Sequence, residues 1–214
     1  MCWNASVSIN TFLFSSFVLA LIVYNNSYTK YKIQEVNDKW MYLFILSFVF
    51  MQLIEFFLWR NINNKFYNNL FSICAVLLLI CQPIASLMML QNVSLRNMLL
   101  CVYLLGALSY SIYQFSTRHI HTTISKGGHL HWNFFTPYLI AWAFWLFFLF
   151  FSLFYERKPT WFVFILFTLY ISYLNYRKDE SLGTMWCWST NTIMIYYAAY
   201  LLIYLPFLEK ASVC

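Results

Sequence analysis

Seven long apolar stretches, separated by short polar connections, constrain this chain more than any other feature of its sequence. A helix needs about 20 residues to cross the hydrocarbon layer of a bilayer, which is about 30 Å thick. Inside that layer a backbone must satisfy its own hydrogen bonds, and a helix does so within one segment. The sequence therefore predicts an all-α polytopic membrane protein, a single domain over residues 1–214 built as a bundle of about seven transmembrane helices. The expected spans cover approximately residues 6–24, 40–59, 70–90, 95–115, 134–155, 161–176 and 185–205.

The composition points to lipid as the solvent of this chain. Apolar residues make up 62% of it and charged residues only 9%, whereas a soluble domain carries about 25% charged residues. The net charge is +6, but the lysines and arginines form no long basic run, so nucleic acid is not an expected partner. We expect an integral, multi-pass membrane protein whose partners are membrane lipids.

Seven alternating spans divide the connections between two sides of the membrane. The side that holds the N-terminus, here called the first side, also holds connections 60–69, 116–133 and 177–184. Lysine and arginine are split almost evenly between the two sides, so the positive-inside rule predicts no orientation. The unusual residues, in contrast, gather on or near the first side: Cys2, Trp3, Glu55, the four histidines, Trp132, Trp186 and Cys187.

Glu55 is the one acidic residue well inside a predicted span. A charged side chain at the bilayer centre costs roughly 2.5 kcal/mol or more, and such residues usually face the bundle and mark functional sites. Gln52 lies three residues earlier, on the same helical face. We expect Glu55 to point inward about one turn below the first side and to contact the N-terminal segment or the start of the fifth or seventh span. A purely structural carboxyl group is the alternative interpretation.

The third stretch contains the pair Gln82-Pro83. A proline inside a helix removes one hydrogen bond and frees the carbonyl group one turn earlier, here near Leu79. Gln82 can satisfy such a group or line a cavity. Antiparallel packing would place Gln82 about 12 Å deeper than Glu55, because a helix rises 1.5 Å per residue.

The start of the seventh stretch places Trp186, Cys187 and Asn191 near the first side, with Asn191 one helical turn after Cys187. Hydrogen bonds that only pack helices together are the alternative role for these residues. The predicted ligand-binding set comprises Glu55, Gln52, Gln82, Trp3, Cys2, Trp132, Trp186, Cys187 and Asn191.

All four histidines lie in connection 116–133, as two His-x-His pairs. Alternate residues of an extended segment face the same way, and histidine is a common metal ligand. We therefore keep His119, His121, His129 and His131 as metal candidates, although solvated or headgroup-facing histidines are the preferred interpretation and no cofactor is expected. Stretch 185–205 contains no lysine, so a retinal Schiff base is not expected either.

Five motifs occur in order along nearly the whole chain. They are Met1-Cys2-Trp3, Met51-Gln52 with Glu55, Gln82-Pro83, Gly128-His129-Leu130-His131-Trp132, and Trp186-Cys187. Together they resemble an uncharacterised family of small multipass membrane proteins that begin Met-Cys-Trp, with members in microbes and large DNA viruses. The resemblance implies the multi-pass topology and singles out these residues, but it implies no activity. The abundance of Phe, Tyr, Ile, Asn and Lys suits a viral or protist member.

These observations favour a binding protein, such as a sensor or carrier. Its ligand would be a small amphipathic molecule or a lipid held in a pocket around Glu55, near one membrane face, because aromatic walls with few polar groups suit such ligands. One alternative is a membrane-embedded enzyme that uses Glu55 and the loop histidines, with or without a metal. Another is an ion or proton channel gated by Glu55, and a last one is an assembly factor without a site. Whether the chain is an enzyme stays open.

Overall fold

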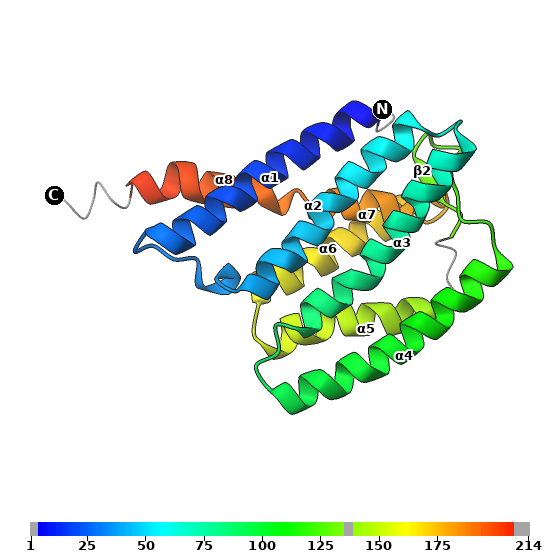
Figure 1. The fold of residues 1–214 in the computed structure, drawn as a ribbon. Helices are drawn as coiled ribbons and strands as arrows, with labels where there is room; N and C mark the ends of the chain where they lie inside the picture. Colours follow the sequence, from blue (N-terminus) through cyan, green and yellow to red (C-terminus); the bar gives the residue numbers. More distant parts are fainter. Residues whose placement is uncertain (1–3, 135–138, 208–214) are drawn as a thin grey trace.

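The computed structural model describes residues 4–134 and 139–207, and this part of the chain is mainly helical (Figure 1). The expected helical class is thereby confirmed in outline. The elements, in chain order, are α1 (Ala5–Tyr28), the short 3-10 helix η1 (Gln34–Val36), α2 (Lys39–Arg60), α3 (Lys65–Leu87), α4 (Val93–Thr117), β1 (Thr122–Ile124), β2 (Leu130–Trp132), α5 (Leu139–Tyr155), α6 (Pro159–Tyr176), α7 (Leu182–Thr190), α8 (Ile193–Ala199) and the π-helical segment η2 (Tyr200–Tyr204).

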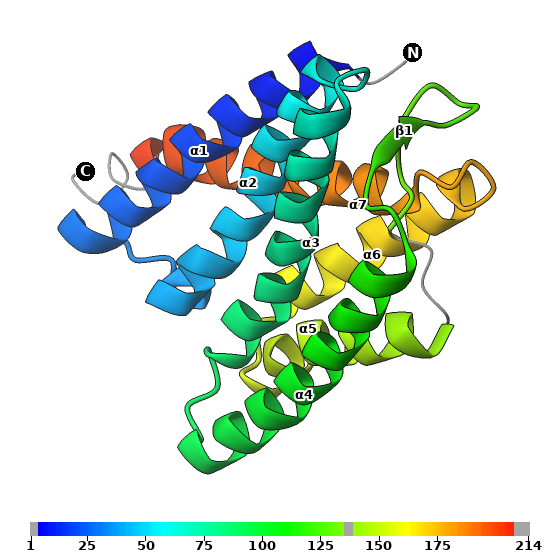
Figure 2. The same ribbon diagram turned by 45° about the vertical axis from the view of Figure 1, so that its right-hand side comes forward.

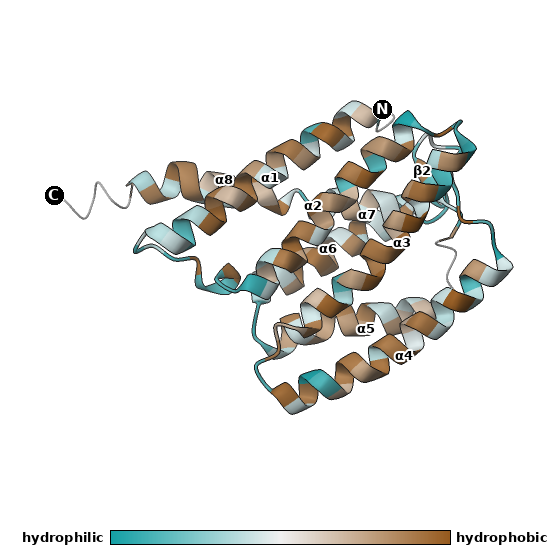
Figure 3. Ribbon diagram, in the orientation of Figure 1, coloured by the Kyte–Doolittle hydropathy of each residue, from teal (hydrophilic) through white to brown (hydrophobic). Residues whose placement is uncertain are grey.

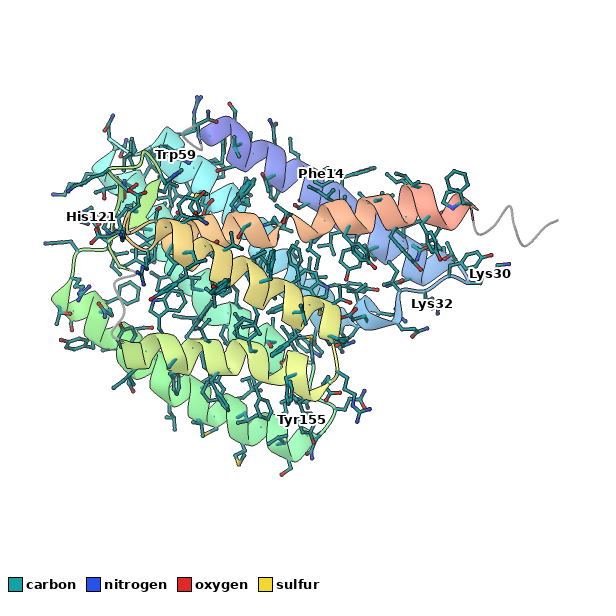
Figure 4. The ribbon with its side chains drawn as sticks, turned by 180° about the vertical axis from the view of Figure 1, so that it is seen from behind. Phe14, Lys30, Lys32, Trp59, His121 and Tyr155 are labelled. Atoms are coloured by element: carbon teal, nitrogen blue, oxygen red, sulfur yellow. The ribbon has the colours of Figure 1, made fainter. Side chains whose placement is uncertain are left out.

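Successive long helices run in alternating directions. Figures 1 and 2 show the ends of α2, α4 and α6 at the same end of the molecule as the starts of α1, α3, α5 and α7. Figure 4 places Trp59 and His121 at this end, and Lys30 and Lys32 at the opposite end. The end that holds Trp59 and His121 is called the first end below. It corresponds to the first side deduced from the spacing of the apolar stretches.

The helix starts follow from local chemistry. Asn4, Asp38, Asn64 and Asn92 stand immediately before α1, α2, α3 and α4, and each accepts a hydrogen bond from a backbone N–H of the first turn. Such caps satisfy N–H groups that have no partner inside the helix. Pro159 begins α6, where its missing N–H is no loss.

Helix α2 lies in the middle of the bundle, where it packs against α1, α3 and α7. Helix α4 lies at the periphery and contacts only α3 and α5 among the element pairs with more than marginal contact. The largest buried cluster joins α1, α2, α5, α6, α7 and α8 through Val18, Phe44, Phe48, Leu149, Trp161, Trp186 and Tyr197. This arrangement surrounds the inner face of α2, which carries Gln52 and Glu55.

Most residues of the long helices are apolar (Figure 3), and many of them face outward. Large side chains with more than half of their surface exposed include Leu13, Phe17, Leu105, Ile112, Phe154, Val163 and Ile195. Within the described residues, four helices, α1 to α4, are long and apolar enough to cross a membrane, and α5 contributes a shorter apolar helix over Ile140–Tyr155. The expectation of seven full spans is therefore confirmed only in part.

Helix α6 carries polar residues on its inner face, among them Thr168 and Ser172. The hydroxyl groups of Thr168 and Thr190 are 3.5 Å apart, and those of Ser172 and Ser189 are 3.2 Å apart. These pairs join α6 to α7 inside the bundle, so the polar residues serve packing between two helices.

The predicted span 185–205 does not form a single α-helix. The chain forms α7, a tight turn at Asn191 and Thr192, α8 and then η2. At the turn the backbone bonds shorten to three residues, from Asn191 N–H to the Trp188 carbonyl and from Thr192 N–H to the Ser189 carbonyl. Hydroxyl and amide side chains in this run hydrogen-bond to nearby carbonyl groups, and such bonds compete with the regular helical ladder.

Connection 116–133 contains a β-hairpin, which the predicted all-α class did not include. Strands β1 and β2 pair antiparallel, with Thr122 opposite Trp132 and Ile124 opposite Leu130. Gly128 has a φ of 80°, a conformation that side chains other than glycine rarely adopt, and it permits the turn between the strands. The hairpin brings all four histidines close to the first end of the bundle.

Helix α3 continues through Pro83 as far as Leu87. The proline has no N–H to offer the carbonyl group of Leu79. That carbonyl instead accepts a hydrogen bond from the indole Nε1 of Trp145 in α5, at 2.8 Å. The freed carbonyl predicted from the sequence therefore ties α3 to α5.

Candidate binding sites

Glu55 points into the bundle, as expected, and only 4% of its surface is exposed. Gln52 is completely buried, and its Nε2 donates a hydrogen bond to Glu55 Oε2 at 3.0 Å. The second carboxylate oxygen of Glu55 and the amide oxygen of Gln52 have no hydrogen-bond partner. A buried polar group without a partner is unusual enough to require an explanation.

A small void borders Glu55 on the side of the hairpin. Its walls come from α1, α2, the hairpin and α7: Val7, Ser8, Glu55, Trp59, His129, Leu130, Thr184, Met185 and Trp188. The structure thus brings Glu55 together with the N-terminal helix and the start of the seventh stretch. The void measures about 20 Å³, and one water needs about 10–15 Å³ of such volume. It therefore has room for a water molecule, but not for the lipid or amphipathic ligand expected around Glu55.

Asn191 and Cys187 lie where α7 packs against α2. Asn191 Nδ2 donates to the carbonyl groups of Phe48, at 3.1 Å, and Cys187, at 2.9 Å. Cys187 is buried and interacts electrostatically with Glu55. The Oδ1 atom of Asn191, like the unpaired oxygens of Gln52 and Glu55, is buried without a partner.

The other predicted site residues do not join this group. Gln82 is fully buried, neither of its amide atoms has a partner, and it does not border the Glu55 void. Trp132 stacks on Phe134, with ring centroids 5.6 Å apart. Trp186 Nε1 donates to the Ile165 carbonyl at 3.3 Å, so this ring belongs to the aromatic core. Cys2 and Trp3 lie outside the described residues.

The histidines serve separate contacts. His119 and His121 are exposed, and the ring of His121 contacts the His119 carbonyl and the Asn133 amide. His131 Nδ1 lies 3.6 Å from Glu180 Oε2. Only His129 borders the Glu55 void. Among the described residues no group of three or more His, Cys, Asp or Glu side chains is arranged to hold a metal ion.

Asp179, in the α6–α7 connection, holds the hairpin against the bundle. Its carboxylate accepts hydrogen bonds from Ser125 Oγ at 2.7 Å, Gly127 N–H at 2.6 Å and Ser181 Oγ at 2.9 Å. Burial raises the pKa of Asp179, but these hydrogen bonds outweigh burial and hold its pKa below the ordinary value. Burial also lowers the pKa of His129, more than the charge of Asp179 raises it, so His129 is neutral at pH 7.

A much larger cavity, which the sequence did not reveal, lies between α3, α4 and α5. Its volume is about 480 Å³, and its walls are almost entirely apolar. The small residues Ala107 on α4 and Ala141 on α5 line this space, Phe144 packs directly against Gly106, and Trp142 and Trp145 form part of the wall. A stretch of small side chains within the otherwise bulky fourth and fifth spans was the signal that could have indicated it.

Polar residues of α4 also line this cavity. Gln114 Nε2 donates a hydrogen bond to the Tyr110 hydroxyl at 2.6 Å, and both residues line the cavity together with Ser111. The cavity therefore combines a hydrocarbon-like wall with a few polar residues near the end of α4.

Comparisons of the chain with protein-family models, with curated proteins and with solved structures find no match. The argument for function therefore rests on the geometry of these two sites.

Proposed function

We propose that this chain is an integral, multi-pass membrane protein that binds the hydrocarbon part of an amphipathic lipid in the cavity between α3, α4 and α5. The observation that carries the proposal is the cavity itself, about 480 Å³ in volume with a nearly continuous apolar wall. Ligand pockets typically measure about 300–1,000 Å³. The proposal keeps the binding function favoured by the sequence and moves the ligand away from Glu55.

The outward-facing apolar residues support the membrane setting. Exposed apolar patches of this extent are rare on soluble monomers. Helices α5 and α6, with 17 and 18 residues, would each extend about 26 Å at 1.5 Å per residue, close to the hydrocarbon thickness. We propose that these two helices and the segment from α7 to η2 cross the membrane together with α1 to α4. This topology agrees with the resemblance to the small multipass proteins that begin Met-Cys-Trp.

The size of the cavity argues for a resident ligand. A cavity of about 150 Å³ in an engineered protein binds benzene, and this one is about three times as large. The cavity is partly open to the outside, so a hydrocarbon chain from the bilayer could fill it.

Polar residues at one end of the cavity give the ligand an orientation. Tyr110, Ser111 and Gln114 line the cavity near the first end of the bundle, so the polar part of the bound lipid should lie there. The hydrocarbon would then extend along Ala107 towards Tyr103 and Ile80.

Filling the cavity tests the proposal. Ala141→Trp places a large ring in the cavity, whereas Ala143→Trp, two residues along the same helix, places it on the exposed face. Protein purified in mild detergent is analysed by native mass spectrometry for co-purified lipid. We expect a bound lipid on the unchanged protein and on Ala143→Trp, and its loss from Ala141→Trp. Equal lipid content in all three proteins would overturn the proposal.

A further inference from the structure

We propose that Gln52, Glu55 and Asn191 form a binding site for one monovalent cation of the size of sodium, where α2 meets α7. Each side chain is at least nine-tenths buried, with exposed fractions of 0%, 4% and 3%. Each also has one oxygen without a hydrogen-bond partner: Oε1 of Gln52, Oε1 of Glu55 and Oδ1 of Asn191. This site is separate from the lipid cavity, and the two proposals stand or fall independently.

Hydrogen bonds place the three side chains along one face of α2. Gln52 and Glu55 are joined by a bond of 3.0 Å. Asn191 Nδ2 donates to the carbonyl group of Phe48 at 3.1 Å, and Phe48 lies one turn before Gln52 on the same face of α2. The backbone of α7 tightens at Asn191, which directs this amide towards α2. The carboxylate and the two amides therefore lie along one face of α2, where it packs against α7.

The number of available donors favours a cation. A proton on Glu55 alone would supply one donor for the three unpaired oxygens, and a water molecule alone would supply at most two. A bound cation contacts all of them at once and also balances the buried carboxylate, which is otherwise costly. Among the described residues, the one ion pair joins His131 to Glu180, so no basic side chain forms an ion pair with Glu55.

The ligand set selects the type of cation. Carboxylate and amide oxygens are hard ligands that suit hard cations. A single carboxylate neutralises a monovalent ion, whereas a divalent ion would leave a net positive charge in an apolar interior. The void beside Glu55 holds about one water, which can complete the coordination shell from the first side.

Thermal unfolding in different salts tests this site. Purified protein is heated in sodium, potassium or choline chloride at one ionic strength and at pH 7.5. At a sodium concentration about ten times Kd, we expect Tm to rise by about 3–6 °C over choline, with a smaller rise in potassium. Glu55→Gln keeps the shape of the side chain and should remove the sodium response.

Two further measurements complete the test. Gln82→Leu removes another fully buried, unpaired amide outside the site and should retain the sodium response. If Glu55→Gln does not fold, broadening of the sodium-23 NMR signal by the unchanged protein, reversed by excess lithium but not by choline, gives the same answer. Equal Tm in all three salts, or a sodium response that persists in Glu55→Gln, would overturn the proposal. A Tm that responds to pH but not to sodium would show that a proton occupies the site, and would also overturn it.

Discussion

Replacing Trp145 by phenylalanine probes the link between α3 and α5 that Pro83 creates. The indole N–H of Trp145 is the donor to the Leu79 carbonyl, at 2.8 Å, because Pro83 has no N–H to offer. Trp145→Phe keeps an aromatic ring but leaves that carbonyl without a partner. A buried polar group that loses its partner costs about 1–3 kcal/mol, and the smaller ring adds a loss of packing.

A double-mutant cycle separates the two contributions. Pro83→Ala restores a backbone N–H one turn after Leu79, so the carbonyl no longer depends on Trp145. In the Pro83→Ala background, Trp145→Phe should cost only the packing of the larger ring. This packing cost is the same with Pro83 present, so it cancels when the two effects of Trp145→Phe on the free energy of unfolding are subtracted. We therefore expect a coupling energy of about 1–2 kcal/mol between the two substitutions.

The assay is reversible unfolding of the purified protein in mixed micelles with a rising fraction of SDS. Trp142→Phe, on the same helix and in the same cavity wall, is the matched control, and its effect should be the same with and without Pro83→Ala. Additivity of Trp145→Phe and Pro83→Ala within about 0.5 kcal/mol would refute the reasoning. It would mean that the Leu79 carbonyl does not need the indole.

Three further predictions concern the hairpin. Gly127→Ala should release the hairpin, because a Cβ there would lie 2.5 Å from Asp179 Oδ2, and this is measurable as faster amide exchange over residues 122–132. The pKa of Asp179 is lower in the folded protein, so its carboxylate stabilises the hairpin fully above the ordinary pKa of an aspartate, and this stabilisation is lost as the pH falls below about 4. Amide exchange of the hairpin, corrected for intrinsic rates, should therefore stay constant from pH 7 to 5 and change below pH 4. Asp179→Asn should abolish that change. The pKa of His129 is also lower in the folded protein, so the unfolded chain takes up the proton first and Tm should fall as the pH drops from 7.5 to 5.5. His129→Gln should reduce that fall in Tm. An unchanged fall would contradict the assignment of this effect to His129.

The sequence was sufficient for the features that depend on hydropathy and on local chemistry. Apolar stretches separated by polar connections predicted the approximate positions of α1 to α4. The inward direction of Glu55 followed from the cost of exposing a carboxylate to lipid. The need of the Leu79 carbonyl for a new partner followed from Pro83, although the identity of that partner, Trp145, depended on how α5 packs.

Features that depend on competition or on tertiary packing were not predictable in the same way. The run Ser189 to Thr192 looks apolar enough in its surroundings to continue a span, but its side chains compete for backbone carbonyl groups and tighten the helix. The large cavity depends on how far α4 stands from α5, which no single stretch encodes. Its discovery moved the proposed ligand from Glu55, where only about 20 Å³ is open, to a space of about 480 Å³.

The central claim is that a hydrocarbon chain occupies the cavity between α3, α4 and α5, and photocrosslinking tests it most directly. A lipid with a diazirine within its hydrocarbon chain is added to the protein in nanodiscs, illuminated, and its adducts are mapped by mass spectrometry. The account predicts adducts concentrated on Ala107, Ser111 and Ala141, which line the cavity, and their loss in Ala141→Trp. Adducts spread evenly over outward residues such as Leu105 and Phe147, and unchanged in Ala141→Trp, would contradict it.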